Sequence, residues 1–378
     1  MTQDRAVGAG QEDAGSAATA AHRAPFPARA RMSDVAAAAG VSTTTVSLVL
    51  SGKAGTSIPM PTQERVLRAS RVLGYRANTL ARGLRIRSSD TIGFVSDVIA
   101  STPFAGAMIH GAHQAAAAAG KLLLIVNTER DPDVEARAID TLHGRQVEAI
   151  IYATMFHRVV EPPSALREAH WVVLDSRTTD SRDSWVVPDE EGGAYAATTM
   201  LVDLGHLRIG YLQDVHRGPA AEERLAGYRR ALTDSGLGFD PELVAEDRDQ
   251  PFGGAAAAAA LLALPEPPTA LFCYNDRMAM GAYRAARRAG LSVPEDLSIV
   301  GFDNQDQIAP WLDPPLTTVQ LPHEALGRWA VEHLLGVLSG DIEGPRQQRM
   351  RCPLVLRDSV APPRDRTGGS PAPRRERS

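Results

Sequence analysis

The stretch MSDVAAAAGVSTTTVSLVL, which runs from Met32 to Leu50, decides how the N-terminal part of the chain folds. Ser33 and Ser42 each precede a run of residues that can form a short helix. A serine hydroxyl at such a position can accept a hydrogen bond from an N–H group that the first helical turn leaves unpaired. Gly40 breaks the small apolar run between the two serines. The stretch therefore predicts two short helices joined by a glycine-containing turn.

The second of these helices has an apolar side and a polar side. Val46, Val49 and Leu50 are spaced so that they share one face, and the serine and threonine hydroxyl groups point elsewhere. Two short helices of this kind form a helix-turn-helix, in which the N-terminal residues of the second helix meet base edges in the DNA major groove. A helical hairpin that only packs is the alternative, and the motif alone does not decide between the two.

A third helix is expected to complete a small head at residues 31–76. A loop from Lys53 to Pro61 leads into this helix, and Gly74 ends it. Its apolar face packs on the first two helices, so the three helices share one small core. The predicted core of the head consists of Val35, Val46, Leu50, Val66 and Leu73.

Charge is distributed unevenly along the 378 residues, whose net charge is −5. Between Arg31 and Ser88 there are nine Lys or Arg residues but only Asp34 and Glu64 as acids. This segment therefore carries +7, and the rest of the chain carries −12. A basic module on an acidic body is typical of a module that binds a polyanion such as DNA. A basic face that is merely solvated is the alternative.

Length and composition limit the class of protein. The length predicts two or three domains, and 44% hydrophobic with 22% charged residues is a globular balance. Cys273 and Cys352 form neither a disulfide framework nor a metal-ligand spacing, so we expect a cytoplasmic protein without a metal site. No stretch reaches the roughly 18 apolar residues of a membrane span. Residues 1–30 and 362–378 read as a disordered leader and a disordered basic tail.

Residues 77–89 are predicted to be a hinge helix and linker. Asn78 can cap a helix, but the segment from there to Arg85 is only about two turns long, and such a helix is unstable alone in water. Gly83 weakens it further. We expect the hinge to be helical only when it is pressed against DNA and a partner chain.

Residues 90–361 alternate between strands and helices. Apolar strands such as TIGFV, LLLIV, AIIYA, WVVLD, ALFC and SIVGF are separated by helical segments. This alternation predicts parallel sheets that are covered on both faces, and the length predicts two lobes. Ligands in such folds bind at the carboxyl ends of the strands, so the expected cleft lies between the lobes. No glycine-rich phosphate loop follows any of the strands.

These residues closely resemble the lac-repressor (LacI/GalR) family. The resemblance is carried, in order and spacing, by DVAAAAGVSTTTVSLVLSG, ERVLRASRVLGYRANTLARGLR and TIGFV, and then by PFAGAMIHGAHQAA, LDSRTT, RLAGYRRAL, YNDRMAMGAYRAA, GFDN and PPLTTVQLP. It covers roughly residues 31 to 360. The resemblance implies a helix-turn-helix head, a periplasmic-binding-protein-like body of two lobes, and a homodimeric or tetrameric transcription regulator. Because no leucine-rich heptads follow Pro362, we favour a dimer.

The resemblance also implies the DNA contacts. Thr43, Thr44 and Leu48 occupy the positions of base readers, whereas Ser42, Thr45 and Ser47 would mainly hold phosphates. Asn78 and Leu84 belong to the hinge, where Leu84 would wedge into the minor groove or pack against its mate. Many members of the family carry a polar base-reading residue at the position of Leu48. A leucine there can touch a thymine methyl group but cannot hydrogen-bond to a base.

The expected effector site follows from the same resemblance. Polar residues at the carboxyl ends of strands, an arginine and an aromatic ring suit the hydroxyls and the C–H face of a sugar. The predicted effector-binding residues are Phe104, Asp175, Arg224, Asn275 and Asp303. The alternatives are helix caps or loop contacts for the two aspartates and a surface ion pair for the arginine. Asp189 and His323 rank lower, and Trp311 is assigned to a subunit interface or a packed corner.

Three functions remain to be compared. The first is a DNA-binding transcriptional regulator, a repressor, which binds a near-palindromic operator as a dimer under the control of a sugar. The second is a sugar-binding transport receptor, against which the basic head and the lack of a secretion signal speak. The third is an α/β enzyme, for which no nucleophile, metal cluster or phosphate loop is present in the sequence. We therefore predict a regulator that is not an enzyme and needs neither cofactor nor membrane.

Overall fold

The computed structural model describes residues 30–51, 57–75, 89–98 and 105–364. The chain divides into two compact units, Met1–Arg82 and Gly83–Ser378, each of which is described by itself. The predicted leader, the hinge with Asn78, Gly83 and Leu84, and nearly all of the predicted tail lie outside the described residues.

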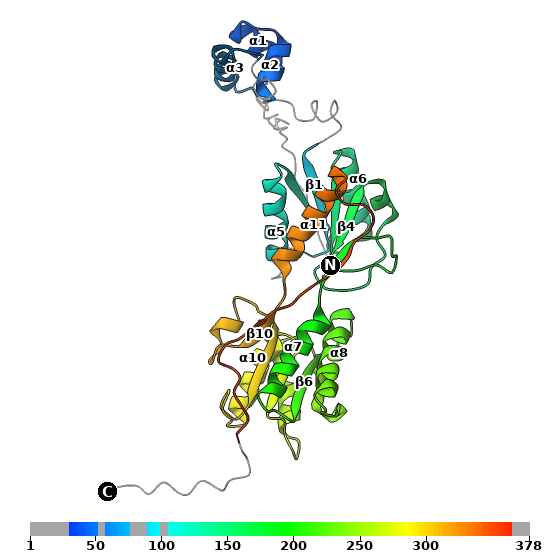
Figure 1. The fold of residues 1–378 in the computed structure, drawn as a ribbon, viewed down its shortest axis with the longest axis vertical. Coiled ribbons are helices and arrows are strands. Elements are labelled where there is room, and N and C mark those ends of the chain that lie inside the picture. The colour runs from blue at the N-terminus through cyan, green and yellow to red at the C-terminus, as the bar shows by residue number, and fades with distance from the viewer. Residues whose placement is uncertain (1–29, 52–56, 76–88, 99–104, 365–378) are drawn as a thin grey trace, which may run out of the picture. The chain divides into compact units, whose positions relative to one another are not determined.

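The first unit contains a head of three helices, α1 (Met32–Ala39), α2 (Thr43–Leu50) and α3 (Met60–Val72) (Figure 1). Val35, Val46 and Val66 contribute one fully buried side chain each to its core. Among the described residues no single helix is long and apolar enough to cross a membrane; α1 and α2 pass that test only as a pair, which bends by 101°. The predicted helix-turn-helix is thus present as two distinct helices.

Two details of the head differ from the prediction. Helix α1 starts at Met32, so Ser33 lies inside its first turn, and the carboxylate of Asp34 accepts the hydrogen bond from the backbone N–H of Arg31 instead (2.7 Å). Leu73 is exposed, and the side chain of Val49 lies in the core. The cap by Ser42 is confirmed, because its Oγ accepts a hydrogen bond from the N–H of Thr45 (3.1 Å).

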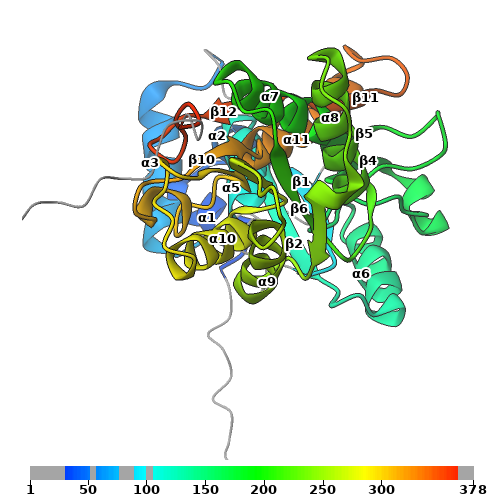
Figure 2. The same ribbon diagram turned by 90° about the horizontal axis from the view of Figure 1, so that it is seen from below.

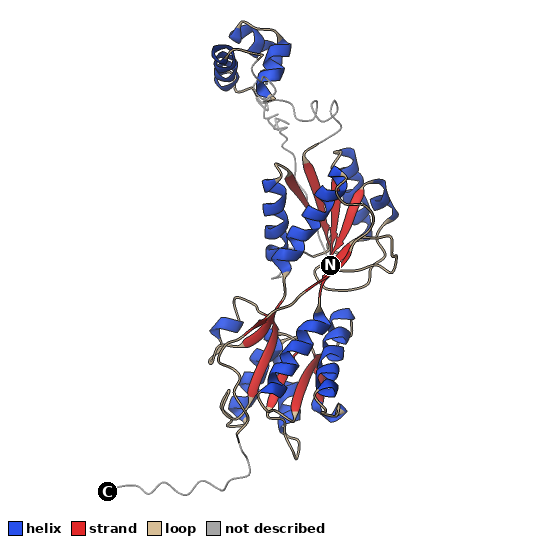
Figure 3. Ribbon diagram, in the orientation of Figure 1, coloured by secondary structure: helices blue, strands red, loops and turns tan. Residues whose placement is uncertain are grey.

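The second unit begins with a lobe whose sheet is entirely parallel, in the order β11-β5-β4-β3-β1-β2. Figure 3 shows the strands of this unit in red and its helices in blue. The strands of this N-lobe are β1 (Thr91–Ser96), β2 (Leu122–Asn127), β3 (Ala149–Ala153), β4 (His170–Leu174), β5 (Trp185–Pro188) and β11 (Gln347–Met350). Its helices are α5 (Ala105–Ala118), α6 (Pro132–Gly144), α11 (His323–Ser339) and the short η1 (Ser164–Glu168). Helices α5 and α11 cover one face of the sheet, and α6 covers the other.

The C-lobe repeats this arrangement with the sheet order β12-β10-β9-β8-β6-β7, in which only β12 is antiparallel. Its strands are β6 (Ile209–Asp214), β7 (Val244–Asp247), β8 (Ala270–Cys273), β9 (Ser298–Asp303), β10 (Thr317–Gln320) and β12 (Leu354–Val355). Its helices are α7 (Glu190–Asp203), α8 (Pro219–Asp234), α9 (Pro251–Leu262), α10 (Asp276–Arg288) and the short η2 (Pro241–Leu243) and η3 (Ala309–Trp311). Helices α7 and α8 pack on one face of the sheet, and α9 and α10 pack on the other (Figure 2).

The chain passes between the two lobes three times. It leaves the N-lobe after β5, returns after β10 into α11, and leaves again between β11 and β12. The predicted fold class, an all-α head followed by two α/β lobes with mostly parallel sheets, is confirmed. Because the strands of both sheets end toward these crossings, residues at or just after their carboxyl ends line the space between the lobes.

Candidate functional site

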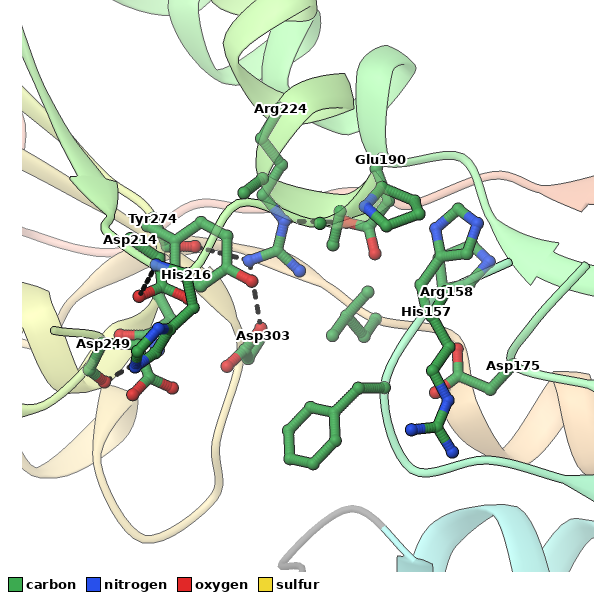
Figure 4. A pocket seen from close by; sticks show the side chains of 18 of the residues that line it. His157, Arg158, Asp175, Glu190, Asp214, His216, Arg224, Asp249, Tyr274 and Asp303 are labelled. Atoms are coloured by element: carbon green, nitrogen blue, oxygen red, sulfur yellow. Dashed lines mark hydrogen bonds and ion pairs between the residues drawn. The ribbon is translucent and has the colours of Figure 1, made fainter. Parts of the chain in front are cut away.

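A cavity of about 440 Å³ lies between the two lobes. The N-lobe contributes to its wall Arg130, Met155, Phe156, His157, Arg158 and Asp175. The C-lobe contributes, among others, Asp214, Arg224, Tyr274, Asn275, Arg277 and Asp303. In Figure 4 His157, Arg158 and Asp175 lie across the cavity from Asp214, Asp249 and Tyr274. Its volume is that of a small-molecule site.

Four of the five predicted effector residues meet at this cavity. Asp175 follows β4, Asn275 lies between β8 and α10, Asp303 ends β9, and Arg224 comes from α8. The three strand-end residues are brought together because parallel strands end on the same edge of their sheets. Phe104, the fifth, lies outside the described residues.

Arg224 is buried in a network of anionic groups. Its Nε donates a hydrogen bond to Oε2 of Glu190 (2.7 Å), and its Nη1 donates to the backbone oxygen of Tyr274 (2.5 Å) and lies 3.6 Å from Oδ1 of Asp303. Burial lowers the pKa of the Arg224 guanidinium, but the charge of Glu190 outweighs this effect and the pKa is raised. The alternative of a surface ion pair is therefore wrong, since this cation is permanent and lies inside the molecule.

Asp175 has no such partner. Its side chain is buried, with 4% of the residue surface exposed, and its carboxylate makes no hydrogen bond or ion pair within the described part of the chain. Burial, assisted by the charge of Glu190, raises the pKa of Asp175 well above its ordinary value. Because it lines the cavity and receives no hydrogen bond from the described residues, this carboxyl group is open to hydrogen-bond donors that enter the cavity.

Asn275 and Asp303 are partly occupied by contacts within the protein. Oδ1 of Asn275 caps α10 by accepting a hydrogen bond from the N–H of Met278 (2.8 Å), and its Nδ2 donates to the backbone oxygen of Asp249 (3.1 Å). Asp303 accepts a hydrogen bond from Nε2 of Gln305 (3.0 Å). Burial raises the pKa of Asp303, and the charge of Arg224 opposes the rise. Both residues border the cavity, but each also has a structural role.

The structure adds wall residues that the prediction omits. Phe156, His157 and Arg158 follow directly after β3, and Glu190 follows β5. The rule that selects Asp175, a polar residue after an apolar strand, also selects His157 and Arg158. Both ring nitrogens of buried His157 lack a hydrogen-bond partner among the described residues. Burial, only partly offset by the charge of Glu223, lowers the pKa of His157 to about 4, so the ring is neutral.

The three lower-ranked residues behave differently from one another. Buried His323 lines the cavity. Asp189 does not line it, and its Oδ1 instead accepts a hydrogen bond from the N–H of Gly192 (3.0 Å) at the start of α7. Trp311 is 81% exposed, so the packed corner predicted as one option is wrong. Its assignment to a subunit interface stays a prediction.

The predicted DNA-reading residues lie on α2. Thr43, Thr44 and Leu48 are exposed on the surface of the head, as a residue that touches DNA must be. Ser42, Thr45 and Ser47 lie beside them, and the hydroxyl groups of Ser42 and Thr45 are 2.9 Å apart. These side chains are accessible to DNA, and their contacts with it stay a prediction.

Two family models match the chain. Residues 31–78 match the model described as bacterial regulatory proteins, lacI family, and residues 198–360 match that of the periplasmic binding protein-like domain. The HTH-type transcriptional repressor CytR of Escherichia coli (strain K12) is 35% identical over 339 residues, which are 88% of this chain and 96% of CytR.

Solved structures give the same result. The lac repressor dimer bound to operator and the anti-inducer ONPF has a TM-score of 0.73 and 26% identity, over 88% of this chain and 99% of that chain. The complex of the transcriptional regulator CelR with cellobiose has a TM-score of 0.61 and 29% identity, over 88% of this chain and 100% of that chain. The relatives are transcriptional regulators and not enzymes, which removes the enzyme alternative.

Proposed function

This chain belongs to the LacI family of bacterial regulatory proteins and is a DNA-binding transcriptional repressor with a ligand-binding body, and from this premise we propose its effector and its operator. The proposed effector is a sugar that binds in the cavity between the lobes. The proposed operator is a near-palindromic duplex that a dimer of the chain binds.

The observation that carries the sugar proposal is the unpaired, buried carboxyl group of Asp175. It lies across the cavity from Asp303, and Arg224 supplies the fixed cation beside Asp303. Neighbouring hydroxyls of a sugar donate to such carboxylates and accept from such a guanidinium. Phe156 and Tyr274, which also line the cavity, offer apolar faces to the C–H side of a sugar ring. The relative CelR has been solved with cellobiose bound.

Control of DNA binding requires that the sugar prefer one arrangement of the lobes. A ligand that touches residues of both lobes favours the lobe separation that lets it make both sets of contacts. The sugar can change operator affinity by no more than the ratio of its own affinities for the two arrangements of the lobes. We propose that the lobe movement acts on residues 77–89, which carry Leu84 in the predicted hinge.

The operator proposal rests on the surface of α2 and on the dimer. Thr43 and Thr44 present hydroxyls that hydrogen-bond to base edges, and Leu48 presents a methyl group that suits a thymine methyl group. Two heads on one dimer read two half-sites of opposite orientation. The related lac repressor structure is a dimer on operator DNA. We place exposed Trp311 at the subunit interface, because aromatic side chains are enriched at protein–protein interfaces.

The operator is tested by selecting bound sequences from random duplexes with the purified full chain. We expect an inverted repeat to be enriched. Thr44→Ala should weaken binding to that repeat by about 1–3 kcal/mol while leaving affinity for random DNA unchanged. Enrichment of a single asymmetric site, or none, would contradict the operator proposal, and equal loss on random DNA would make Thr44 a positioning contact only.

The sugar is tested by fluorescence anisotropy of the labelled operator. Mono- and disaccharides are added one at a time, with nucleosides and purine bases as a comparison set. We expect at least one sugar to shift operator affinity five-fold or more, the usual lower range of allosteric coupling. If only nucleosides or bases shift it, the repressor stands but its effector is not a free sugar.

A further inference from the structure

Two arginines of the N-lobe wall share one carboxylate. Arg130 follows β2, Arg158 follows β3, and both line the cavity. Nε of Arg130 and Nη2 of Arg158 lie 3.3 Å and 2.6 Å from the same oxygen, Oδ2 of buried Asp97. The other oxygen of Asp97 accepts hydrogen bonds from the backbone N–H groups of Val98 (2.9 Å) and Met155 (3.0 Å). Both carboxylate oxygens of Asp97 are thus occupied, and its single negative charge is paired with the positive charges of two arginines.

The two guanidinium groups keep unused donors. Each guanidinium has five N–H groups, and the contact with Asp97 uses only one group from each arginine. Nε of Arg158 is buried and has no hydrogen-bond partner within the described part of the chain, so the donors that Arg158 offers to a ligand are those of its Nη groups. The side chains are 52% and 36% exposed, so a ligand in the cavity can reach them.

The backbone holds Arg130 in an unusual position. Glu129 and Arg130 have φ values of 51° and 61°, so two consecutive residues with side chains adopt the left-handed region. Asp131 then caps α6 through the N–H groups of Asp133 and Val134. The guanidinium of Arg130 is placed 5.9 Å from the centre of the Phe156 ring. Strain of this kind at a cavity is a feature of binding sites.

The rest of the N-lobe wall does not cancel the excess positive charge. This wall also contains Asp175, but its carboxylate makes no ion pair with Arg130 or Arg158, whose ion pairs within the described residues are with Asp97. His157 places a neutral imidazole with two unpartnered nitrogens beside Arg158. The C-lobe wall differs, because Arg277 there is paired with Asp249, and Asp214 lies beside them. A ligand with one anionic end is therefore oriented with that end toward the N-lobe.

From this asymmetry we infer that the sugar effector carries an anionic group, a phosphate ester or a carboxylate, which Arg130 and Arg158 bind. The inference rests on the proposed sugar effector and makes it more specific. Two guanidinium groups with free donors match the several acceptor oxygens of such a group, and the contact is charge-assisted. The hydroxyls of the same sugar then face Asp175 and the C-lobe.

The test is calorimetric titration of the full chain with matched ligands. The probes are glucose with glucose 6-phosphate and glucuronate, galactose with galactose 6-phosphate and galacturonate, and ribose with ribose 5-phosphate. We expect an anionic member to bind at least ten-fold more tightly than its neutral parent in dilute salt, with the ratio falling as salt is raised. The phosphate and carboxylate arms separate the two anion classes.

Variants decide which residues bind the anion. Arg158→Gln and Arg130→Gln should each lower the affinity for the anionic sugar at least ten-fold more than they lower the affinity for its neutral parent. Arg145→Gln, at an exposed arginine after α6, is the matched control and should change neither. If Arg158→Gln fails to fold, Arg130→Gln still tests the inference, because the side chain of Arg130 is half exposed.

The possible failures are distinct. If a neutral sugar binds as tightly as its anionic forms, or if anionic binding survives both arginine variants, the anion inference is wrong and the sugar proposal stands. If no probe of either kind binds, the sugar proposal fails and the inference fails with it.

Discussion

Asp175 and Arg224 are buried in the same cavity but in opposite electrostatic situations. Arg224 has Glu190 and Asp303 beside it. Replacing Arg224 by alanine leaves these two buried carboxyl groups without their cation, so we expect the free energy of unfolding to fall by about 3–5 kcal/mol. Loss of effector response in such a variant would be confounded with loss of folding. Replacing Asp175 leaves no partner group unpaired, which makes it the better residue for testing the site.

Asp175→Asn should keep the fold and lose the ligand. At pH 7 we expect the free energy of unfolding to be about 1 kcal/mol higher, because a buried ionisable group is replaced by a neutral one. Sugar affinity should fall at least ten-fold, since an amide accepts fewer hydrogen bonds than a carboxylate. Denaturation and calorimetry measure the two effects, and Asp140→Asn on the exposed side of α6 should change neither.

The pH dependence of that stability difference has a defined sign. The folded pKa of Asp175 is raised, so its contribution to stability is fully present below its unfolded pKa and is lost as the pH rises through the folded pKa. The gain from Asp175→Asn should therefore be present at pH 7 and disappear near pH 4. A gain of equal size at both pH values would mean that the carboxyl group is not the cause.

His157 should show the opposite pH dependence. Its folded pKa is lowered to about 4 by burial, with Glu223 opposing and Arg177, Arg349 and Arg224 assisting. Its contribution to stability is therefore fully present above pH 6.5 and is lost as the pH falls toward 4, by on the order of 3 kcal/mol. His157→Asn should flatten this part of the acid denaturation profile.

The matched control for His157 is His110→Asn, at an exposed histidine of α5. Subtracting the profile of each variant from that of the unchanged chain cancels the buried acids, whose raised pKa values act in the other direction. Equal acid sensitivity of the two variants would contradict the assignment to His157.

Among the elements, helices α5 and α11 approach each other through glycine. A Cβ atom built on Gly327 of α11 would lie 1.9 Å from the backbone oxygen of Met108, and one built on Gly111 of α5 would lie 1.9 Å from that of Glu324. These contacts are backbone, so neither helix can yield without moving as a whole. The close crossing lets α11 cover the N-lobe sheet after it returns from the C-lobe.

Gly327→Ala and Gly106→Ala should shift the stability of the N-lobe in opposite directions. The first forces α5 and α11 apart and should lower the free energy of unfolding by about 1–3 kcal/mol or more. The second lies in α5 where an added Cβ meets nothing within 4 Å, so it should raise that free energy by roughly 0.5–1 kcal/mol. Urea denaturation measures both, and a neutral Gly327→Ala would mean that the crossing is loose.

The elements also mark the limit of what the sequence can predict. Strands β1, β4 and β9 are apolar runs buried on both faces, and such runs identify parallel strands directly. Strand β7 reads VAED and β11 reads QQRM, and these polar edge strands form only because a neighbouring strand supplies hydrogen bonds. The sequences of β7 and β11 carry no periodic pattern of apolar residues. Pairing with a neighbouring strand in the folded molecule makes these segments strands.

In the candidate site, too, some features can be predicted from the sequence and others depend on tertiary packing. Asp175 and Asp303 follow strongly apolar strands, so their place at a strand end is visible in the sequence. The burial of Arg224 and its contact with Glu190 depend on how α7 and α8 pack together, and no local pattern encodes that packing. The contact of Arg130 and Arg158 with Asp97 likewise depends on the tertiary structure, since the three residues come from three loops.

In the two-lobed body as a whole, ion pairs join the lobes beside the cavity. Glu223 of α8 in the C-lobe binds Nη1 of Arg177 after β4 (3.0 Å) and both Nη atoms of Arg349 on β11 (2.7 and 3.0 Å). Both arginines belong to the N-lobe, so this carboxylate spans the gap between the lobes. Glu223 is also the sequence neighbour of Arg224, so the cavity wall and the interlobe contact share one turn of α8.

Glu223→Gln should therefore alter effector binding without touching the cavity wall. The amide loses the charge that holds Arg177 and Arg349, so the arrangement in which both lobes line the cavity becomes less populated, and sugar affinity should fall by about three- to ten-fold. The matched control is Glu246→Gln, which breaks a pair with Arg217 inside the C-lobe and should leave affinity unchanged. Calorimetry gives the affinities, and small-angle scattering of the free chain should show a larger radius of gyration for Glu223→Gln only. Unchanged or tighter sugar binding by Glu223→Gln would mean that the ligand prefers an arrangement of the lobes in which this contact is absent.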